Sequence, residues 1–286
     1  MSREVQRMTE EVLKVSHLSV SFTQYDRGFG RREISGIEDL NISVKSGEIV
    51  AVVGSSGSGK SLLAHAVMGI LPYNASMNGE LFFCGEPLTG ERVKKLRGHE
   101  IVLVPQSISY LDPLMKIGPQ ITKGSRKREI KERCRKILAG YGLKEDIMEK
   151  FPFQLSGGMI RRVLISTAVM ENPKLVIADE PTPGLHSEAA RRVMGHFREL
   201  ADKGAGVLLI THDLELAVMT ADRAVVLYAG QTIEEAETSA FLDEEKLKHP
   251  YTKALCRSMP AKWNTGGGKL CDTGEILEYM RKEYGK

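Results

Sequence analysis

The sequence predicts an α/β fold that joins a mostly parallel sheet to an N-terminal antiparallel β subdomain. Apolar runs of strand length recur along the chain, and several end in polar residues, as the C-terminal ends of parallel strands do. One of these runs leads through a glycine-rich loop into an apolar stretch of helical length. Before it, residues 12–44 alternate apolar and polar side chains around a polar turn at 25–30, which is typical of antiparallel strands.

The glycine-rich loop lies between a predicted buried strand at 48–53 and a predicted helix at 62–68. Its residues are Gly54, Ser55, Ser56, Gly57, Ser58, Gly59, Lys60 and Ser61. Glycines let the backbone curl so that N–H groups point at phosphate oxygens, and the helix N-terminus adds the positive end of its dipole. The pattern predicts a phosphate-binding loop in which Lys60 reaches the terminal phosphates and Ser61 holds Mg²⁺. The strand and helix around the loop disfavour the alternative of an accidental turn.

Gln106 ends the next apolar run, residues 101–105. Its side chain offers a metal ligand and a water contact, although a lone glutamine is a weak signal. The following segment, residues 107–153, is rich in charge, and Lys123 to Lys136 is highly basic and compatible with a helix. A solvated helix face is the plain interpretation of such a run.

A second candidate anion site is the string Leu155-Ser156-Gly157-Gly158-Met159, which opens a predicted helix through residues 163–170. Ser156, Gly157 and Gly158 leave free N–H groups and one hydroxyl at the start of this helix. The alternative is a capped helix that binds no ligand.

Two further strands end in candidate catalytic groups. Residues 175–178 lead into Asp179 and Glu180, and residues 206–211 lead into His212. A carboxylate at the C-terminal end of a parallel strand lies beside the phosphate loop, so Asp179 suits a metal ion and Glu180 suits a general base for water. His212 is placed to contact the γ-phosphate and to orient the water or Glu180, and Asp213 to cap the next helix. Read alone, the carboxylates would indicate a solvated turn and the histidine a structural hydrogen bond.

Together these motifs resemble those of the ATP-binding cassette (ABC) family, and the string at 155–159 distinguishes that family from other phosphate-loop ATPases. The resemblance covers about Glu11 to Pro260 and is narrowest to the ATPase subunits of oligopeptide, dipeptide and nickel importers. Four local strings carry this narrower match: Tyr110-Leu111-Asp112-Pro113, Ile117-Gly118-Pro119-Gln120-Ile121, Tyr228-Ala229-Gly230-Gln231 and His249-Pro250-Tyr251-Thr252-Lys253-Ala254-Leu255.

The resemblance implies a phosphate-loop ATPase core with an inserted α-helical lobe at about 107–170. It implies a nucleotide-binding domain at 1–263 and a C-terminal tail at 264–286, in which we expect a short helix near 276–281. ATP and Mg²⁺ are the implied ligands, and Phe22 or Tyr25 is the implied aromatic platform for adenine, since adenine stacks on aromatic faces. For Phe22, a core aromatic is the equal alternative.

The implied partners are a second ATPase chain, two multispanning membrane subunits and an extracytoplasmic solute-binding protein. Ser156 and its glycines then grip the γ-phosphate of ATP on the opposite chain, and the basic run belongs to the lobe that docks on the membrane subunits. A cassette component of a soluble multienzyme complex is the alternative function. A DNA-repair or chromosome ATPase is disfavoured, because no heptad stretch separates Lys60 from Ser156.

Composition agrees with a peripheral protein at the cytoplasmic face of a membrane. The 286 residues carry a net charge of +3, from 40 basic and 37 acidic side chains, so nothing indicates nucleic acid as a partner. No apolar span reaches the length that crosses a bilayer, and the polar residues 1–11 lack a signal-peptide core. Four scattered cysteines indicate reduced thiols. With only Cys256 and Cys271 after the histidine-proline-tyrosine string, we expect no iron–sulfur cluster.

Two departures from the family pattern stand out. His186 occupies a position where the family has an aspartate at the dimer interface, which predicts a pair with a different cassette chain and unequal ATP sites. Neutral drift in a tolerant loop is the alternative. Ile160-Arg161 replaces the commoner Arg-Gln, and we expect this change to remove a polar interface group.

Overall fold

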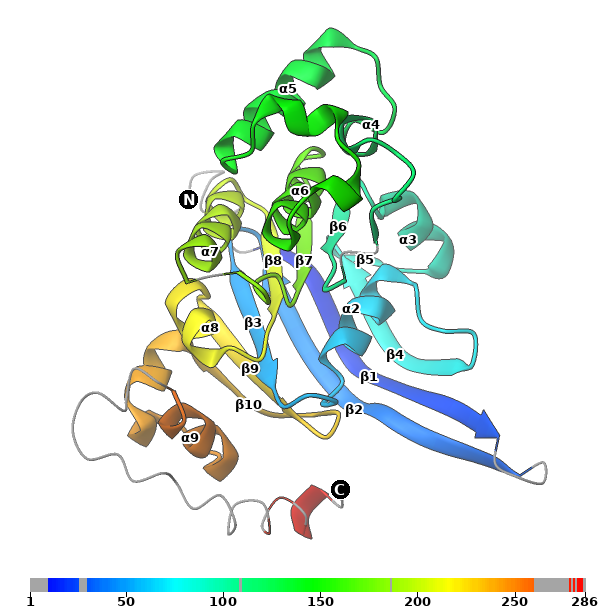
Figure 1. Ribbon diagram of the computed structural model, residues 1–286. Coiled ribbons are helices and arrows are strands. Elements are labelled where there is room, and N and C mark those ends of the chain that lie inside the picture. Colours follow the sequence, from blue (N-terminus) through cyan, green and yellow to red (C-terminus); the bar gives the residue numbers. More distant parts are fainter. Residues whose placement is uncertain are drawn as a thin grey trace.

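The computed structural model describes residues 10–25, 30–107, 110–185, 187–259, 278, 280 and 282–284, and it consists of two sheets with helices around them (Figure 1). The first sheet is antiparallel and contains β1 (Glu11–Tyr25), β2 (Arg31–Lys45), β4 (Ala75–Phe83) and β5 (Glu86–Pro87) in the order β2-β1-β4-β5. It confirms the predicted N-terminal β subdomain. The central part of the predicted turn, residues 26–29, lies outside the described residues.

The second sheet has the order β10-β9-β3-β8-β7-β6, and only β10 runs antiparallel. Its strands are β3 (Ile49–Gly54), β6 (Ile101–Val104), β7 (Leu175–Asp179), β8 (Gly206–Ile210), β9 (Arg223–Tyr228) and β10 (Gln231–Glu237). Every residue of β3, β7 and β8 is buried, as expected for parallel strands covered on both faces. The predicted α/β class with a mostly parallel sheet is confirmed.

The helices lie around the sheets and above them in Figure 1. They are α2 (Lys60–Met68), α3 (Gly90–Leu96), α4 (Ile117–Ile121), α5 (Arg128–Gly140), α6 (Gly157–Val169), α7 (Ser187–Asp202), α8 (Leu214–Thr220) and α9 (Pro250–Arg257), with 3₁₀ turns η2 (Glu145–Glu149), η3 (Pro152–Gln154), η4 (Thr238–Leu242) and η5 (Glu244–Lys246). One core cluster joins β3, β6, β7 and β8 to α4, α5 and α6, so the upper helices pack on the sheet through apolar side chains.

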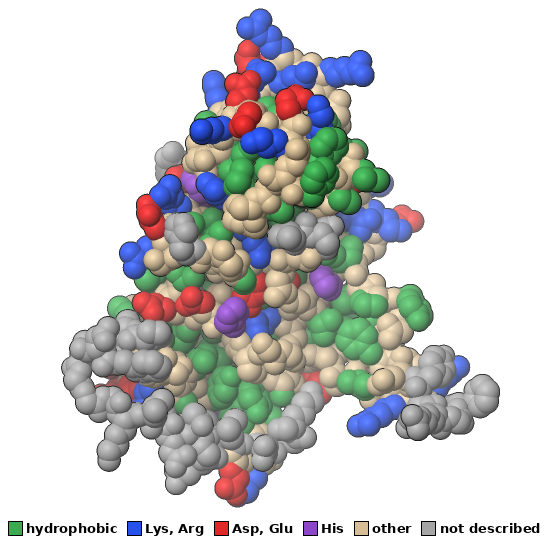
Figure 2. All heavy atoms as spheres, in the orientation of Figure 1, with side chains coloured by type: hydrophobic (Ala, Val, Ile, Leu, Met, Phe, Trp, Pro, Cys, Tyr) green, Lys and Arg blue, Asp and Glu red, His purple; other side chains and the backbone are tan. Residues whose placement is uncertain are grey.

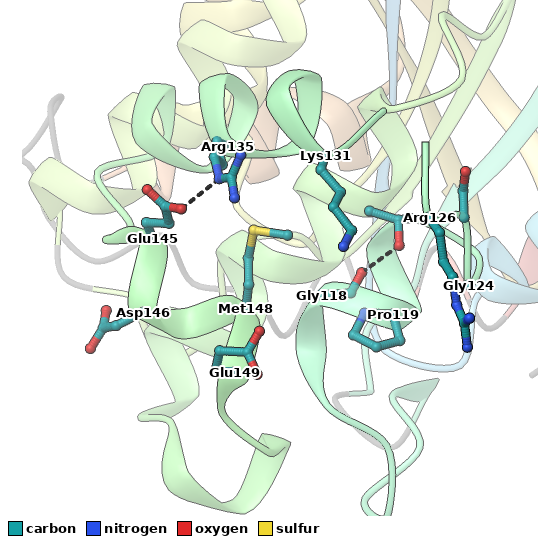
Figure 3. A pocket seen from close by; sticks show the side chains of 12 residues that line it. Gly118, Pro119, Gly124, Arg126, Lys131, Arg135, Glu145, Asp146, Met148 and Glu149 are labelled. Atoms are coloured by element: carbon teal, nitrogen blue, oxygen red, sulfur yellow. Dashed lines mark hydrogen bonds and ion pairs between the residues drawn. The ribbon is translucent and has the colours of Figure 1, made fainter. Parts of the chain in front are cut away.

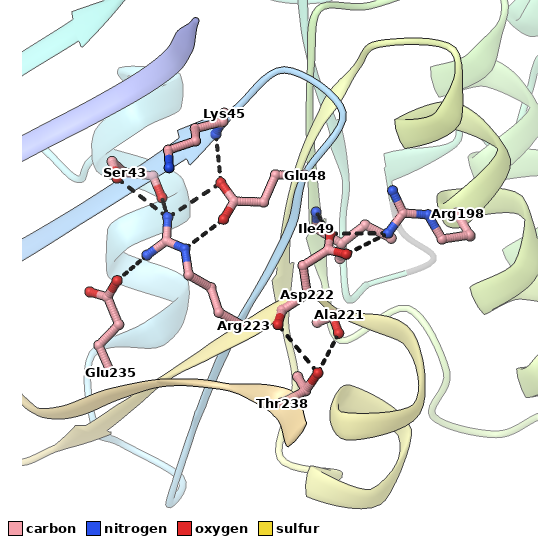
Figure 4. Close-up of polar contacts among 10 residues, drawn as sticks. All are labelled: Ser43, Lys45, Glu48, Ile49, Arg198, Ala221, Asp222, Arg223, Glu235 and Thr238. Carbon is pink, nitrogen blue, oxygen red and sulfur yellow. Dashed lines mark hydrogen bonds and ion pairs between the residues drawn. The ribbon is translucent and has the colours of Figure 1, made fainter. Parts of the chain in front are cut away.

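Ion pairs and hydrogen bonds around the buried Arg223 side chain fix the end of the second sheet that lies away from the loop (Figure 4). Arg223, at the start of β9, donates to Glu48 over 2.6 Å, contacts Glu235, and also reaches the carbonyl of Ser43 in the first sheet. Asp222 accepts the backbone N–H of Ile49 over 2.7 Å. Because the Arg223 charge is buried, losing its carboxylate partners would leave it without compensation, so this network anchors the start of β3.

The C-terminal end of the chain is described only in part. Residues 278, 280 and 282–284 are helical, and the predicted division at 263/264 falls outside the described residues. Cys271 also lies outside them, whereas the thiol of Cys256 is buried against the carbonyl of Phe241 at 2.8 Å. None of the helices that the structure describes is long and apolar enough to cross a bilayer.

Candidate active site

The glycine-rich loop joins β3 to α2 and is held in a tight curl. Gly54 and Gly59 have φ angles of +154° and +97°, in the region that favours glycine. A Cβ at Gly54 would lie 2.1 Å from the carbonyl oxygen of Leu227, and one at Gly59 would lie 2.8 Å from that of Gly36. No side chain caps α2 and its first turn holds no acidic residue, so its N-terminal N–H groups are available to an anion.

Lys60 folds back over this loop. Its ammonium donates to the carbonyl oxygens of Gly54 at 2.9 Å and Ser55 at 2.8 Å. Burial lowers the pKa of Lys60, and the nearby carboxylates of Glu180 and Asp179 act in the opposite direction. The charge is therefore already positioned at the loop before any anion arrives.

Ser61 and Asp179 form the second part of the site. The Ser61 hydroxyl donates to Asp179 Oδ1 over 3.2 Å, which links α2 to the end of β7. Asp179 is buried, and this burial raises its pKa, although the bond from Ser61 counteracts the effect. The two oxygens lie as an adjacent pair of the kind that a hard cation prefers.

Glu180 and His212 form the third part. Glu180 Oε2 lies 2.8 Å from His212 Nδ1, so the C-terminal ends of β7 and β8 share this contact. The carboxylate is 9% exposed and the imidazole 63% exposed. Glu180 has a φ angle of +47°, a left-handed backbone conformation that is unfavourable for residues other than glycine. Such strained residues are often found at functional sites. The carboxylate is thus held in one position, with an exposed proton donor or acceptor beside it.

These parts surround one open cavity of about 320 Å³. It is lined by Ser56, Gly57, Gly59, Lys60, Ser61, Leu62, Gln106 and Glu180. The structure therefore brings Gln106 and Glu180 to the loop, as the sequence predicts, and it links Asp179 through Ser61 and His212 through Glu180. All four meet there because β6, β7, β8 and β3 are parallel neighbours whose carboxyl ends share one edge.

Comparison with known proteins agrees with this geometry. Residues 37–183 match the family model described as ABC transporter. The chain is 35% identical to the oligopeptide transport ATP-binding protein OppD of Lactococcus lactis subsp. cremoris (strain SK11), over 97% of this chain and 84% of that protein. The chain belongs to the ATP-binding cassette family.

Other relatives extend the match. The oligopeptide transport ATP-binding protein AppD of Bacillus subtilis (strain 168) is 36% identical, over 87% of this cassette and 78% of its own length. A dimeric structure of the ATP-binding cassette MJ0796 with ADP and Pi has a TM-score of 0.69 at 27% identity, and the match covers 79% of this cassette and 98% of MJ0796. The fold and the ATP-binding subunit class are therefore those the sequence predicts.

The string at residues 155–159, which distinguishes the family, does not line the cavity around Lys60. Ser156, Gly157 and Gly158 are described, and none of them lines the cavity around Lys60. Ser156 is exposed and caps α6, accepting the N–H of Met159 over 3.3 Å. The start of α6 has no acidic residue in its first turn, so it too is an open helix N-terminus.

Arg161 is a charged neighbour of the site that sequence reasoning missed. It is 5% exposed and donates from α6 to the carbonyl oxygen of Pro105, the residue before Gln106, over 2.8 Å. Burial lowers the pKa of Arg161, against the pull of Glu180 and Asp179. Ile160 and Arg161 are both buried within this chain, and the expectation that their change removes a polar interface group stays a prediction. The departure from the family pattern singled out position 161, but it did not predict that the Arg161 side chain points toward Pro105.

Three predicted residues stay without a demonstrated contact to the site. Phe22 is half-buried and packs on the core of the first sheet, in line with the core alternative, and its role toward adenine remains a prediction. Tyr25 ends β1, and its side chain lies outside the described residues. His186 also lies outside them.

Proposed function

We propose that this chain hydrolyses ATP and thereby powers a membrane transporter that imports peptides, working as a peripheral subunit at the cytoplasmic face. The observation that carries the proposal is the convergence of Lys60, the Ser61–Asp179 pair and the Glu180–His212 pair on one cavity. ATP hydrolysis requires groups that bind the phosphates, ligands for a divalent cation and a base in a fixed position.

ATP binding uses the loop and Lys60. The triphosphate lies along the loop N–H groups and the start of α2, while the Lys60 ammonium turns from the carbonyls of Gly54 and Ser55 to the terminal phosphates. Because the loop backbone and the start of α2 are already in place, binding reorients the Lys60 side chain and orders little else.

Mg²⁺ fits the residues present. The Ser61 hydroxyl and the Asp179 carboxylate would hold the ion, and Gln106 lines the same cavity. When bound, Mg²⁺ neutralises charge that develops on the phosphates. The described residues hold no group of three or more His, Cys, Asp or Glu side chains placed to hold a metal, which agrees with an ion that keeps several waters and phosphate oxygens as ligands.

Hydrolysis uses Glu180 as the base for the attacking water. His212 bonds the Glu180 carboxylate at 2.8 Å, so it orients this group and presents its exposed edge to the γ-phosphate. The backbone N–H of Glu180 donates to Ile210 over 2.9 Å, which ties the base to the neighbouring strand.

A second cassette chain completes each site. Ser156 at the start of α6 does not line the cavity around Lys60 of its own chain, so it is free to face ATP bound to another chain. The related cassette MJ0796 has a dimeric structure, which supports such an arrangement. We expect the isolated chain to bind Mg-ATP but to hydrolyse it slowly, at a rate per chain that rises with concentration. A fast rate that is independent of concentration would contradict this arrangement.

Helices α4, α5 and α6, at the top of Figure 1, carry the surface that contacts the membrane subunits. Figure 2 shows charged side chains at their tip and hydrophobic side chains below. Leu114, shortly before α4, is 86% exposed, and Phe153, in η3, is 74% exposed. A cavity of about 580 Å³ opens between α4, α5 and η2, with Lys131 directed into it and Glu149 at its rim (Figure 3). Exposed apolar side chains beside a charged cavity suit a protein partner better than a solvated face.

The named relatives transport oligopeptides, which favours peptides over nickel as the cargo. The test is purification of the tagged chain from membranes, followed by reconstitution of the assembly. Recovery of two multispanning subunits, and ATP hydrolysis stimulated by a peptide-loaded binding protein, would support the proposal. Recovery with soluble enzymes alone would support the alternative of a soluble multienzyme complex.

A further inference from the structure

Arg161 carries a buried charge that the proposed hydrolysis of ATP does not use. Among the described residues, the buried charged side chains are Lys60, Arg161, Asp179, Glu180 and Arg223. Three of them, Lys60, Asp179 and Glu180, belong to the candidate active site, and Arg223 has carboxylate partners within ion-pair distance. Arg161 forms no ion pair with a described residue, and an arginine stays charged even when it is buried. A charge kept in this way needs a reason other than an ion pair.

The carbonyl that Arg161 contacts lies just past the end of β6. The Arg161 guanidinium donates to the Pro105 oxygen over 2.8 Å, and Pro105 is itself buried. Because β6 is the edge strand of its sheet, no further strand covers that side. No backbone N–H in the described part of the chain donates to the Pro105 oxygen. Arg161 therefore satisfies a buried acceptor that the sheet leaves open.

This bond holds the backbone at Gln106. The Pro105 oxygen lies in the same planar peptide unit as the nitrogen and Cα of Gln106, so a donor that fixes the oxygen also fixes that Cα. On the preceding side, the pairing of Val104 with Ala178 anchors the strand. Gln106 is exposed and lines the cavity around Lys60, and its side chain makes no hydrogen bond to a described residue. The peptide before Gln106 therefore sets where its amide begins.

The charge of Arg161 allows its two possible effects on a bound cation to be told apart. Glu180 and Asp179 stabilise the charged guanidinium from beyond ion-pair distance, against the cost of burial. By its charge alone, Arg161 would repel a divalent cation held by Asp179. By fixing Gln106, it would instead favour the cation. Removal of Arg161 thus changes the affinity for the ion in opposite directions under the two effects.

We propose that Arg161 is a positioning residue for the divalent cation of the ATP site, which holds Gln106 in the cavity through the Pro105 carbonyl. The proposal rests on the proposed ATP-binding function and deepens it, because it names a residue that acts on the ion through Gln106. A ligand that is fixed in advance loses less freedom when the ion binds, so an outer contact that fixes it strengthens metal binding.

The test compares Arg161→Met, which removes the charge and the donor but fills similar space, with Arg162→Met on the same helix. Arg162 donates instead to the carbonyl of Tyr141, over 3.0 Å, and is the matched control. Titration of the full-length chain with a fluorescent ATP analogue, in Mn²⁺ and again in a chelator, gives the gain in affinity that the ion supplies.

We expect Arg161→Met to reduce this gain about threefold to tenfold, the scale of one lost hydrogen bond, with the affinity in the chelator unchanged. Arg162→Met should leave both affinities unchanged. A general loss of structure would lower the affinity in the chelator as well. If Arg161→Met does not fold, Arg161→Lys takes its place, and we expect a smaller loss of the gain because the shorter side chain weakens the bond without emptying the position.

A double-mutant cycle with Gln106→Ala shows whether the effect passes through the amide. Gln106→Ala should itself reduce the gain, and Arg161→Met should reduce it no further in that background. An unchanged or larger gain in the Arg161 variant, an unchanged gain in Gln106→Ala, or additive losses in the cycle would overturn the proposal. If the unaltered chain binds no ATP analogue, the proposed function fails instead, so the two failures are distinguishable.

Discussion

Two helices of this cassette begin without an acidic residue in the first turn, and the chain's own candidate catalytic groups gather around only one of them. At the start of α2, Lys60, the Ser61–Asp179 pair and Glu180 gather around the loop. At the start of α6, Ser156 caps an exposed turn that has no lysine or carboxylate among its first residues. The difference teaches that the parallel sheet brings its candidate catalytic groups to α2 and not to α6, because the carboxyl ends of its strands lie beside α2.

Loss of the charge at α2 should have the largest effect. Lys60→Ala removes the buried ammonium that lies 2.8 Å from the Ser55 carbonyl, and with it the main point charge for the terminal phosphates. We expect ATP binding to be abolished in a titration of the isolated chain. Unchanged nucleotide affinity, in a variant whose thermal unfolding matches that of the original chain, would remove Lys60 from the site.

Loss of the base should separate binding from chemistry at the same helix. Glu180→Gln keeps the shape of the side chain but cannot take a proton, so hydrolysis should slow by about a hundredfold or more while binding of Mg-ATP persists. Turnover in the assembled transporter measures the first quantity and titration the second. Near-normal turnover would exclude Glu180 as the base and would leave His212, which lies 2.8 Å from Glu180, as the other candidate.

The sequence predicted most of the α2 site, because its parts are local motifs at strand ends. Asp179, Glu180 and His212 each follow an apolar run, and the runs at 48–53, 175–178 and 206–211 match the observed strands to within one residue at each end. A parallel sheet then places these ends at one edge without any further information. Asp213 also caps α8 as expected, accepting the N–H of Leu216 over 3.0 Å.

The parts that the sequence did not predict depend on contacts between distant segments. Arg161 reaches Pro105 across the packing of α6 against β6, and no local pattern sets the direction of a side chain there. The Tyr251 ring meets that of Tyr228 edge-to-face at 5.0 Å only because β9 and β10 bring α9 back to the end of β9. Such contacts follow from tertiary packing, which a periodicity in one segment does not encode.

A change at α6 should affect the partner's site and leave the chain's own binding intact. Ser156→Asp keeps a side chain that caps the helix but sets a negative charge where a γ-phosphate would approach. We expect turnover of the assembly to fall at least about tenfold, the scale of a like-charge contact in a partly closed site, with unchanged ATP affinity of the isolated chain. Ser156→Thr, which retains a neutral cap, is the matched control. Weaker binding in the isolated Ser156→Asp chain would show that α6 serves its own site, and the comparison of the two helices would fail.

The smallest effect is expected at His186, which tests whether the two assembled sites differ. His186 follows Thr182 to Leu185, which line a cavity of about 350 Å³ together with His212. A carboxylate there would only accept hydrogen bonds, whereas a neutral imidazole offers one donor and one acceptor and, unperturbed, gains a proton below about pH 6.5. If this histidine makes the sites unequal, His186→Asp should bring their turnover rates closer by a few-fold, as expected for one altered polar contact. Turnover at each site of the assembled transporter, with Glu180→Gln silencing this chain's own base and the matching substitution silencing the partner's, gives the two rates. Unchanged rates and unchanged asymmetry would leave only neutral drift in a tolerant loop.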